Sequence, residues 1–172
     1  MKTLLIIRHA KSGWDHTVRT DFERTLTGSG IVEAETMARR LIERKIKIDG
    51  FVSSPAKRAQ QTASIFISAY KANKENLLLI PSLYEASVKH FYEAIATFND
   101  EDSTVALFAH NPGVTDFVNS TGCSPVYNMP TCAVYGLAIN TNHWKEFANA
   151  KKEFLFFDSP QNIPSIKEPN IN

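Results

Sequence analysis

The stretch LLIIRHA, residues 4–10, decides the fold class of this chain. Its four apolar residues, Leu4 to Ile7, predict a short strand that is buried on both faces. Continuously apolar strands are typical of parallel sheets, whose two faces are covered by helices. Arg8 and His9 follow directly, so they fall at the carboxyl end of the strand. Open parallel sheets bind their ligands outside that edge, and the same stretch therefore indicates a site.

Short apolar runs alternate with helical patterns along the rest of the chain. In the first helical pattern the apolar residues are Ile31, Ala34, Ala38, Leu41 and Ile42. Beyond the first strand, the expected strands are residues 50–53, 77–80, 105–109, 133–139 and 153–157, and the expected helices are residues 28–45, 55–73, 88–98 and 112–119. This alternation predicts the α/β class, with a mostly parallel sheet and helices on both faces.

Length and composition are those of one ordinary globular domain. The 172 residues are 43% hydrophobic and 22% charged, which suits a packed core and excludes disorder of the whole chain. We expect a single domain over residues 1–158 and a loosely attached tail over residues 159–172, which carries three of the eight prolines. The 19 basic and 18 acidic side chains leave a net charge of +1, so no global field recruits nucleic acid or an acidic membrane.

Cysteine content and hydropathy favour a cytoplasmic protein. Cys123 and Cys132 are the two cysteines of the chain and form no zinc-binding spacing, so we interpret them as reduced thiols. The apolar run from Leu4 to Ile7 is shorter than the ~7–15 residues of a secretory signal. No stretch of the sequence approaches the ~20 apolar residues of a membrane span.

Three of the expected strands end in side chains that can do chemistry. They are Arg8-His9, Ser53-Ser54 and His110-Asn111. A cation beside His9 disfavours the imidazolium form and keeps the ring neutral and nucleophilic. Neutral imidazole can attack phosphorus, while Arg8 can hold phosphoryl oxygens with two parallel hydrogen bonds. Taken alone, His9 can equally be a surface or structural histidine.

A basic helix start follows the second of these strands. Ser54 is a favourable N-cap residue and Pro55 is favoured at the first helical position, which predicts a helix that begins at Pro55. Arg58 then falls at the end of the first turn, and its side chain leans back toward the helix N-terminus, where an anion binds. The alternative for Arg58 alone is a solvated helix arginine.

The third strand end has similar features. Asn111 can cap the next helix, with Pro112 at its start. His110, if protonated, can donate a hydrogen bond to a phosphoryl oxygen, although a structural histidine is again the alternative. Two arginines and two histidines at these strand ends would form a pocket that matches a tetrahedral oxyanion.

Missing motifs narrow the chemistry further. The sequence has no GxxxxGK[ST] loop, no HExxH and no CxxxxxR, so it does not match P-loop NTPases, zinc proteases or cysteine phosphatases. The reaction that remains is phosphoryl transfer to histidine without a metal or another cofactor. Glu85, which precedes the third helix, can protonate a leaving oxygen or activate water if burial favours its protonated form. Its alternative role is a favourable interaction with the helix dipole.

Five segments, in order, carry a family resemblance. They are LLIIRHAKSGWD (residues 4–15), DFERTLTGSG (21–30), FVSSPAKRAQQTA (51–63), LYEAS (83–87) and FAHNPG (108–113). They resemble the histidine phosphatase superfamily, and most closely its phosphohistidine phosphatase (SixA-type) branch. The resemblance covers nearly the whole chain, and it implies a three-layer α/β/α sandwich like that of phosphoglycerate mutase.

The resemblance also implies roles for individual residues. His9 would be the phosphorylated nucleophile, and Arg8, Arg58 and His110 would bind the phosphoryl group. Glu85 would match the acid of the mutase-like members, although some small SixA-type members lack a carboxylate at that place.

The chain departs from the family pattern at two positions. Ala10 replaces the glycine of the common Arg-His-Gly, a variant that is frequent in the SixA-type branch. Asp15 stands where mutase-like members often carry an asparagine that contacts phosphate; because an acid there would repel phosphate, we leave Asp15 out of the pocket. Arg24 matches a pattern of the branch, and we expect it to pair with Asp21 or Glu23 rather than to lie at the pocket rim.

The sequence therefore predicts a metal-independent phosphatase that works through phospho-His9. The resemblance implies phosphohistidine on a protein as the substrate, and the short chain lacks a large insertion that could form a lid. A small phosphomonoester is the second substrate class; a mutase is less favoured, because it needs a closed site that excludes water. The rival classes are a non-enzymatic phosphate-binding module, which should have lost His9 or Arg58, and a metallohydrolase using His9 and His110, which should show flanking DxH or HxE spacings.

Overall fold

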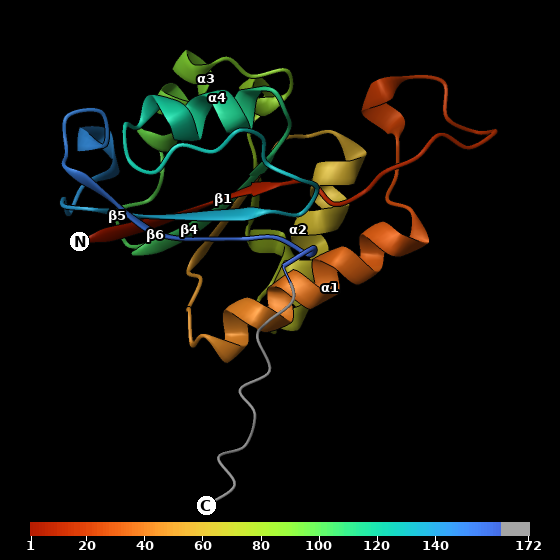
Figure 1. Ribbon diagram of the computed structural model, residues 1–172, viewed down its shortest axis with the longest axis horizontal. Coiled ribbons are helices and arrows are strands. Elements are labelled where there is room, and N and C mark those ends of the chain that lie inside the picture. Colours follow the sequence, from red (N-terminus) through yellow and green to blue (C-terminus); the bar gives the residue numbers. More distant parts are fainter. Residues whose placement is uncertain (163–172) are drawn as a thin grey trace, which may run out of the picture.

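The computed structural model describes residues 1–162, which are built around one six-stranded sheet with the order β3-β2-β4-β1-β5-β6 (Figure 1). The strands are β1 (Lys2–Arg8), β2 (Gly50–Ser53), β3 (Leu77–Leu79), β4 (Thr104–Ala109), β5 (Val134–Ile139) and β6 (Lys152–Asp158). β1 pairs in parallel with β4, as β2 does with β3 and β4, whereas β5 is antiparallel to both β1 and β6. The sheet is therefore mostly parallel, as the alternation of elements predicts, with β5 as the one strand that runs in the opposite direction.

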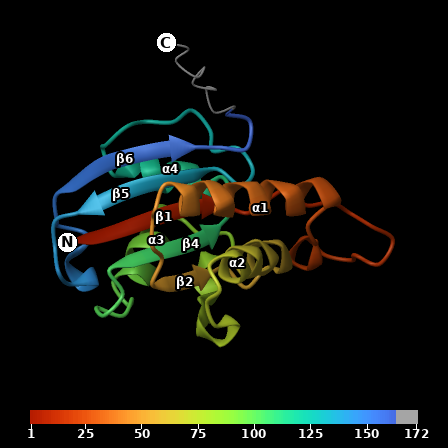
Figure 2. The same cartoon turned by 90° about the horizontal axis from the view of Figure 1, so that it is seen from below.

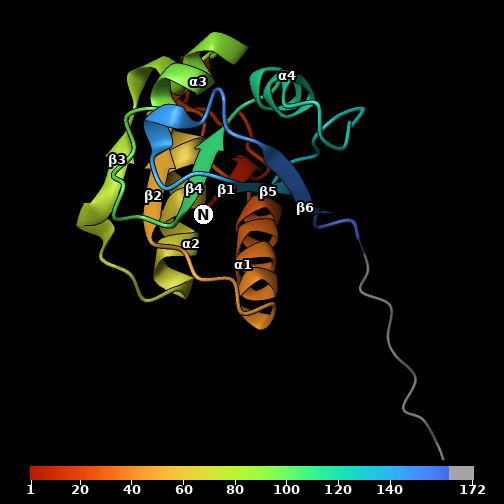
Figure 3. The ribbon, with the colours of Figure 1, turned by 90° about the vertical axis from the view of Figure 1, so that its left-hand side faces the viewer.

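Helices cover both faces of the sheet and complete a three-layer sandwich. They are α1 (Gly28–Glu43), α2 (Lys57–Ala69), α3 (Val88–Ile95) and α4 (Gly113–Ser120), and four short 3₁₀ segments are η1 (Asp21–Glu23), η2 (Lys74–Asn76), η3 (Pro81–Leu83) and η4 (Trp144–Glu146). α1 and α2 lie side by side on one face, as Figure 2 shows, and α3 and α4 lie on the other face (Figure 3).

β1 supplies side chains to the cores on both faces. Leu5 and Ile7 pack with residues of α1 and α2, whereas Leu4 and Ile6 pack with residues of α3 and α4. All four side chains are fully buried, because successive side chains of a strand point to opposite faces and both faces are covered. This explains why the strand reads as an unbroken apolar run.

Three of the expected helices end earlier than the sequence pattern predicts. α1 ends at Glu43 rather than at residue 45, where Lys45 adopts a left-handed backbone conformation with a φ of 58°. α2 ends at Ala69 rather than at residue 73, because Lys71 adopts a left-handed backbone conformation with a φ of 54° and turns the chain away. α3 ends at Ile95 rather than at residue 98, where the backbone bonds shorten to the i to i+3 type and the hydroxyl of Thr97 bonds the carbonyl of Ala94. The spacing of apolar residues alone does not indicate where these helices end.

The packed structure extends past the domain boundary expected at residue 158. The side chain of Asp158 pairs with Arg40 and Arg44 at 3.1 and 2.9 Å, and the carbonyl of the buried Ser159 accepts a hydrogen bond from Arg40. The remainder of the expected tail, residues 163–172, lies outside the described residues. Within residues 1–162, no helix combines the length and the apolar character needed to cross a membrane.

The register of the central strands brings three strand ends together. Arg8 of β1 lies opposite Ala109 of β4, and Ser53 of β2 lies opposite Phe108 of β4. His9, Ser54 and His110 each come one residue after these ends, so three segments distant in sequence meet at one edge of the sheet.

Candidate active site

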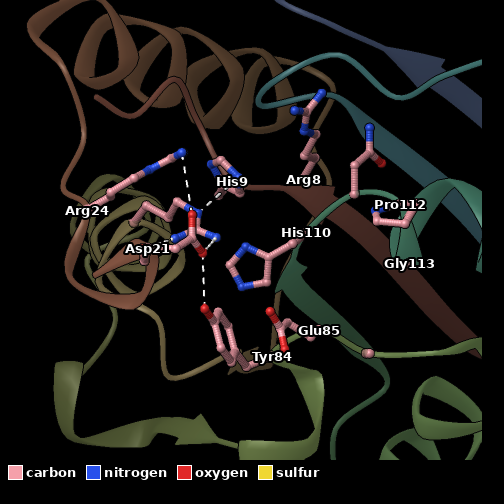
Figure 4. Close-up of a pocket in the computed structure, with 12 residues that line it drawn as sticks. Arg8, His9, Asp21, Arg24, Tyr84, Glu85, His110, Pro112 and Gly113 are labelled. Atoms are coloured by element: carbon pink, nitrogen blue, oxygen red, sulfur yellow. Dashed lines mark hydrogen bonds and ion pairs between the residues drawn. The ribbon is translucent and has the colours of Figure 1, made fainter. Parts of the chain in front are cut away.

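A cleft of about 500 Å³ lies at this edge of the sheet (Figure 4). Its walls come from the ends of β1 and β4, η1, the start of α2, the segment after η3 and the start of α4. The residues that line it are Arg8, His9, Asp21, Arg24, Arg58, Tyr84, Glu85, Ala86, His110, Asn111, Pro112 and Gly113. All five residues proposed from the sequence, Arg8, His9, Arg58, Glu85 and His110, are among them.

Backbone hydrogen bonds fix both the position and the tautomer of His9. Its N–H donates to the carbonyl of Ala109 at 3.0 Å, and its own carbonyl accepts from the N–H of Cys132. In the ring, Nδ1 lies 2.7 Å from the carbonyl oxygen of Ala10. Since a carbonyl only accepts, Nδ1 carries the proton and Nε2 keeps its lone pair. Nε2 accepts a hydrogen bond from Nε of Arg58 at 3.3 Å.

The imidazole of His9 is neutral at physiological pH. Burial is the largest cause of the lowering of its pKa to about 4, and the charges of Arg58, Arg8 and Arg24 act in the same direction. The arginine effect expected from the sequence therefore exists, but desolvation is larger. A neutral ring with a lone pair on Nε2 is the form required of a nucleophile.

Arg58 engages all three of its side-chain nitrogens at the cleft. Besides the contact with His9, its Nη1 donates to the carbonyl of Asp21 at 2.6 Å and its Nη2 donates to the Asp21 carboxylate at 2.8 Å. The Arg58 side chain is buried, whereas Lys57 beside it is exposed. The fork of Arg58 thus already holds an anionic group in the cleft.

The expected start of α2 is wrong by two residues. The helix begins at Lys57 with Ala56 at the N-cap, and no side chain caps it. Ser54 is not the cap because its hydroxyl lies 2.7 Å from Nε2 of His110, and Pro55 precedes the helix. Arg58 is consequently the second residue of α2.

His110 faces the cleft with one unpartnered nitrogen. Its Nε2 contacts the hydroxyl of Ser54, whereas its buried Nδ1 has no hydrogen-bond partner. Burial, and after it the charge of Arg58, lowers its pKa to about 3. The protonated His110 considered from the sequence is therefore not the form present at neutral pH; a neutral His110 donates through a single ring nitrogen.

Asn111 does not cap α4, contrary to the sequence expectation. Pro112 occupies the N-cap position. The Asn111 side chain instead accepts from the hydroxyl of Thr115 at 2.7 Å and donates to Asn128 and to the carbonyl of Met129. Its amide ties the strand end to the loop before β5 rather than to the helix backbone.

Arg8 and Arg24 place two further cations at the cleft. Nη1 of Arg8 donates to the carbonyl of Met129 at 2.8 Å, and Figure 4 shows the side chain extending away from Tyr84 and Glu85. Arg24 pairs with Asp21 at 3.4 Å, as expected, and also bonds the hydroxyl of Ser12. Contrary to the expectation that it stays away from the rim, Arg24 lines the cleft.

Asp21 and Tyr84 belong to the cleft although the sequence reasoning did not assign them to it. The Asp21 carboxylate accepts from Arg58 and from the hydroxyl of Tyr84, the latter at 3.0 Å. Burial opposes ionisation of Asp21, but the hydrogen bond and charge of Arg58 prevail and lower its pKa. The only sequence signals were the Asp21-x-x-Arg24 spacing and the position of Tyr84 beside Glu85; neither shows that η1 lies over the strand ends.

Glu85 lies at the cleft but is exposed rather than buried. Its backbone is left-handed, with a φ of 52°. The carbonyl of the following residue, Ala86, packs against Gly113. A Cβ at position 113 would lie 2.4 Å from that carbonyl oxygen, so glycine is needed for this close approach.

Asp15, which we left out of the pocket, is not a lining residue and bonds Thr17 instead.

Unpaired buried nitrogens gather in this cleft. Within residues 1–162, the buried side-chain polar atoms without a partner are Nε of Arg8, Nε of Arg24 and Nδ1 of His110. Buried polar groups are rarely left unpaired, so three on residues that line one cleft suit the binding of a group that accepts hydrogen bonds. With three arginines around it, the cleft is built for an anion.

Metal ligands are not grouped in the described part of the chain. Residues 1–162 contain no cluster of three or more His, Cys, Asp or Glu side chains that could hold a metal ion. The two cleft histidines, with rings 5.2 Å apart, are accompanied by arginines rather than by further ligands.

Comparison with known proteins gives a family match. The model of the histidine phosphatase superfamily (branch 1) matches residues 4–113. An uncharacterised chloroplastic protein of Arabidopsis thaliana is 26% identical over 153 residues, which cover 84% of this chain and 70% of that protein. The protein histidine phosphatase SixA, solved with tungstate, superposes with a TM-score of 0.78 at 22% identity, covering 92% of this chain and 97% of its own. A variant of phosphoserine phosphatase from Entamoeba histolytica, solved with phosphoserine, gives 0.64 at 15% identity, covering 94% and 98%. At these identities, the two structural matches establish the fold.

Replacement of Arg58 by alanine should reduce kcat/KM for a phosphorylated substrate by about 10²–10³-fold, the loss typical of one preorganised donor to a transition-state oxyanion. Lys57→Ala is the matched control, because Lys57 is the adjacent residue on the same helix and is exposed. It should change kcat/KM by less than about twofold, since exposed charges contribute little. Both variants are compared by steady-state kinetics and by thermal unfolding, and equal kinetic losses would contradict the assignment of Arg58 to the anion site.

Stability should fall as the pH drops from about 6.5 toward about 4. The pKa values of His9 and His110 lie near 4 and 3 in the folded protein, against 6.5 ordinarily. In this window the unfolded chain binds protons that the folded one does not, so each histidine lowers the free energy of unfolding by about 1.4 kcal/mol per pH unit.

Urea unfolding at a series of pH values measures this dependence. His110→Gln should remove about half of the slope, while His16→Ala, which replaces an exposed histidine, should leave it unchanged. A free energy of unfolding that is constant across the window would show that the cleft histidines titrate normally.

Proposed function

The chain belongs to branch 1 of the histidine phosphatase superfamily and is a histidine-nucleophile phosphatase, and from this premise we propose that His9 is its nucleophile. We further propose that it works without a metal and that its substrate is phosphohistidine carried on a protein.

One observation carries the assignment of His9. Its Nε2 has a lone pair, because Nδ1 is committed to the carbonyl of Ala10, and it lies in the cleft that gathers the unpaired nitrogens of Arg8, Arg24 and His110. A nucleophile beside convergent donors is the arrangement that phosphoryl transfer requires, because catalysis of this reaction consists of positioning and charge stabilisation.

The reaction follows from these contacts in two steps. Nε2 of His9 attacks phosphorus, a P–N bond forms, and the bond from phosphorus to the substrate's ring nitrogen breaks. That nitrogen keeps the electron pair, and because the substrate ring already carries a proton on its other nitrogen, it leaves as a neutral imidazole. Water then attacks the phosphoryl group on His9, which releases inorganic phosphate and restores the neutral ring. Arg8, Arg58 and His110 donate to the phosphoryl oxygens throughout, and Arg58 exchanges its bond to Nε2 for one to the substrate.

The acids at the cleft support a phosphohistidine substrate. The Asp21 carboxylate is bonded to Arg58 and Tyr84, and Glu85 faces solvent, so the lining residues include no buried carboxylic acid. An alkoxide leaving group needs a proton from such an acid. Imidazole leaves more easily, above all when it is already protonated, and therefore suits this cleft better.

A small phosphomonoester remains the second candidate substrate. Glu85 and the hydroxyl of Tyr84 both lie at the cleft and are the groups that could deliver a proton to an alkoxide. A non-catalytic phosphate-binding role is disfavoured, because such a protein has no need of the lone pair on His9. The two unpaired thiols, Cys123 and Cys132, agree with the cytoplasmic location that we propose.

Incubation with a phosphohistidine peptide that carries radiolabelled phosphate should label His9 transiently, with a bond that is labile in acid and stable in base. His9→Ala should abolish both label and turnover, whereas His16→Ala, at an exposed position, should retain both. Label on a serine, aspartate or cysteine, or on another histidine, would refute the mechanism. Undiminished turnover in excess chelator is expected; complete loss would refute metal independence.

Glu85→Gln distinguishes the two substrate classes. The variant should lower kcat/KM for an alkyl phosphate strongly, and for a phosphohistidine peptide by under ~10²-fold, the low end for general acid catalysis. Both substrates are measured with both proteins. If the alkyl phosphate is the better substrate of the wild type and the variant lowers kcat/KM equally for both substrates, the result supports a small phosphomonoester and contradicts phosphohistidine as the substrate. If the variant is neutral on every substrate, Glu85 has no part in the reaction.

A further inference from the structure

We propose that Ser54 is a positioning residue whose buried hydroxyl holds His110 in the tautomer that carries its proton on Nδ1, the nitrogen that has no partner among residues 1–162. The proposal deepens the proposed function, since it rests on His110 as a donor to the phosphoryl group. It gives Ser54 a role other than the N-cap that the sequence predicts.

The contact between the two side chains is short and buried. Oγ of Ser54 lies 2.7 Å from Nε2 of His110, and the exposed fractions of the two residues are 0% and 7%. Ser54 is itself held by the sheet, since its N–H donates to the carbonyl of Phe108 at 2.9 Å. The hydroxyl therefore approaches His110 from a rigid element that belongs to the neighbouring strand.

The direction of this hydrogen bond follows from the partners of the hydroxyl. Oγ of Ser54 accepts from the N–H of Ala56 at 3.3 Å, and its single proton has no acceptor other than Nε2 of His110 among residues 1–162. If His110 donated instead, the serine proton would be left unpaired in a fully buried place, at a cost of roughly 1–3 kcal/mol. Ser54 thus donates and Nε2 accepts.

A neutral imidazole that accepts at Nε2 must carry its proton on Nδ1. Nδ1 is buried and unpartnered, and His110 lines the cleft, so this nitrogen is the one that can donate its proton to an anion bound there. In the other tautomer a lone pair would face the phosphoryl oxygens and repel them. Because burial and Arg58 keep His110 neutral, a second ring proton is not available to correct the wrong tautomer.

Both cleft histidines carry the ring proton on Nδ1, but the two rings have opposite roles, one as an acceptor and the other as a donor. In His9 the carbonyl of Ala10 holds the proton on Nδ1 and leaves Nε2 to attack. In His110 the hydroxyl of Ser54 engages Nε2 and leaves the Nδ1 proton for donation. The rings lie 5.2 Å apart and present an acceptor and a donor to the same space.

Isotopic labelling of the histidine ring nitrogens tests the tautomer directly by NMR on the full chain without substrate. Wild-type His110 should show a protonated Nδ1 and an unprotonated Nε2, and Ser54→Ala should shift it toward protonation at Nε2. Ser54→Thr should restore the wild-type pattern, because it restores the hydroxyl. A wild-type His110 that is protonated at Nε2 overturns the proposal, and this readout needs no variant to fold and no enzymatic activity.

Kinetics with an aryl phosphate give the functional consequence. Ser54→Ala should lower kcat/KM by about 10-fold, which is less than the ~10²–10³-fold loss of a whole donor because the ring remains. Ser53→Ala is the matched control: its hydroxyl is equally buried and donates to the carbonyl of Ser54 at 2.8 Å, but it does not contact His110. It should leave kcat/KM within about twofold of wild type.

A double-mutant cycle separates positioning from a general structural role. If Ser54 acts through His110, Ser54→Ala should cost almost nothing further in a His110→Ala background. An equal loss in both backgrounds overturns the proposal. Absence of phosphatase activity in the wild type would refute the proposed function instead, and it would leave the NMR result on the tautomer intact.

Discussion

The parallel pairing of β1 with β4 is the constraint on which the whole cleft depends. Its last rung is the hydrogen bond from the N–H of His9 to the carbonyl of Ala109 at 3.0 Å. That bond fixes where the chain leaves β1 and so sets the distance of the His9 ring from His110. β2 extends the same alignment, because it pairs with β4 on the other side and brings Ser54 to the same edge. A shift of one residue in either pairing would move these side chains to opposite faces of the sheet.

The cleft is electrostatically costly before any substrate is bound. Three arginines converge on two histidines that stay neutral, and several of their nitrogens are buried without partners. Asp21 offsets part of this cost, since its carboxylate accepts from Arg58 and Tyr84 and pairs with Arg24. An incoming phosphoryl group offers more charge and more acceptor oxygens than one carboxylate, so it can compete for Arg58. Such unfavourable arrangements persist at functional sites because the surrounding fold holds them in place.

Sequence reasoning predicted most of the fold, because buried strands and amphipathic helices leave a periodic pattern. It also placed His9, Arg58 and His110 in one cleft, where the structure has them, because His9 and His110 directly follow strands and Arg58 lies at the start of the helix after a third strand. It failed where a side chain bonds a residue that is distant in sequence instead of the backbone of the adjacent helix. Ser54 and Asn111 are both residue types that are favoured at N-caps, yet the side chain of Ser54 bonds His110 and that of Asn111 bonds Asn128 and the carbonyl of Met129. Both helices start without a side-chain cap.

The residues that the sequence reasoning missed illustrate the same limit. Asp21 is separated from Arg58 by 37 positions and lies in η1, within the connection from β1 to α1, which carries no periodic pattern. No sequence feature near Asp21 indicates that contact, so only the tertiary structure could assign Asp21 to the cleft.

The two cleft histidines differ in what holds their rings in place. His9 is set by backbone groups, which survive any side-chain replacement, whereas His110 depends on one serine hydroxyl. In the proposed reaction, the fold itself therefore holds His9, the proposed nucleophile. The proposed donor, His110, depends on a single position, so substitution there would change the stabilisation of the phosphoryl group.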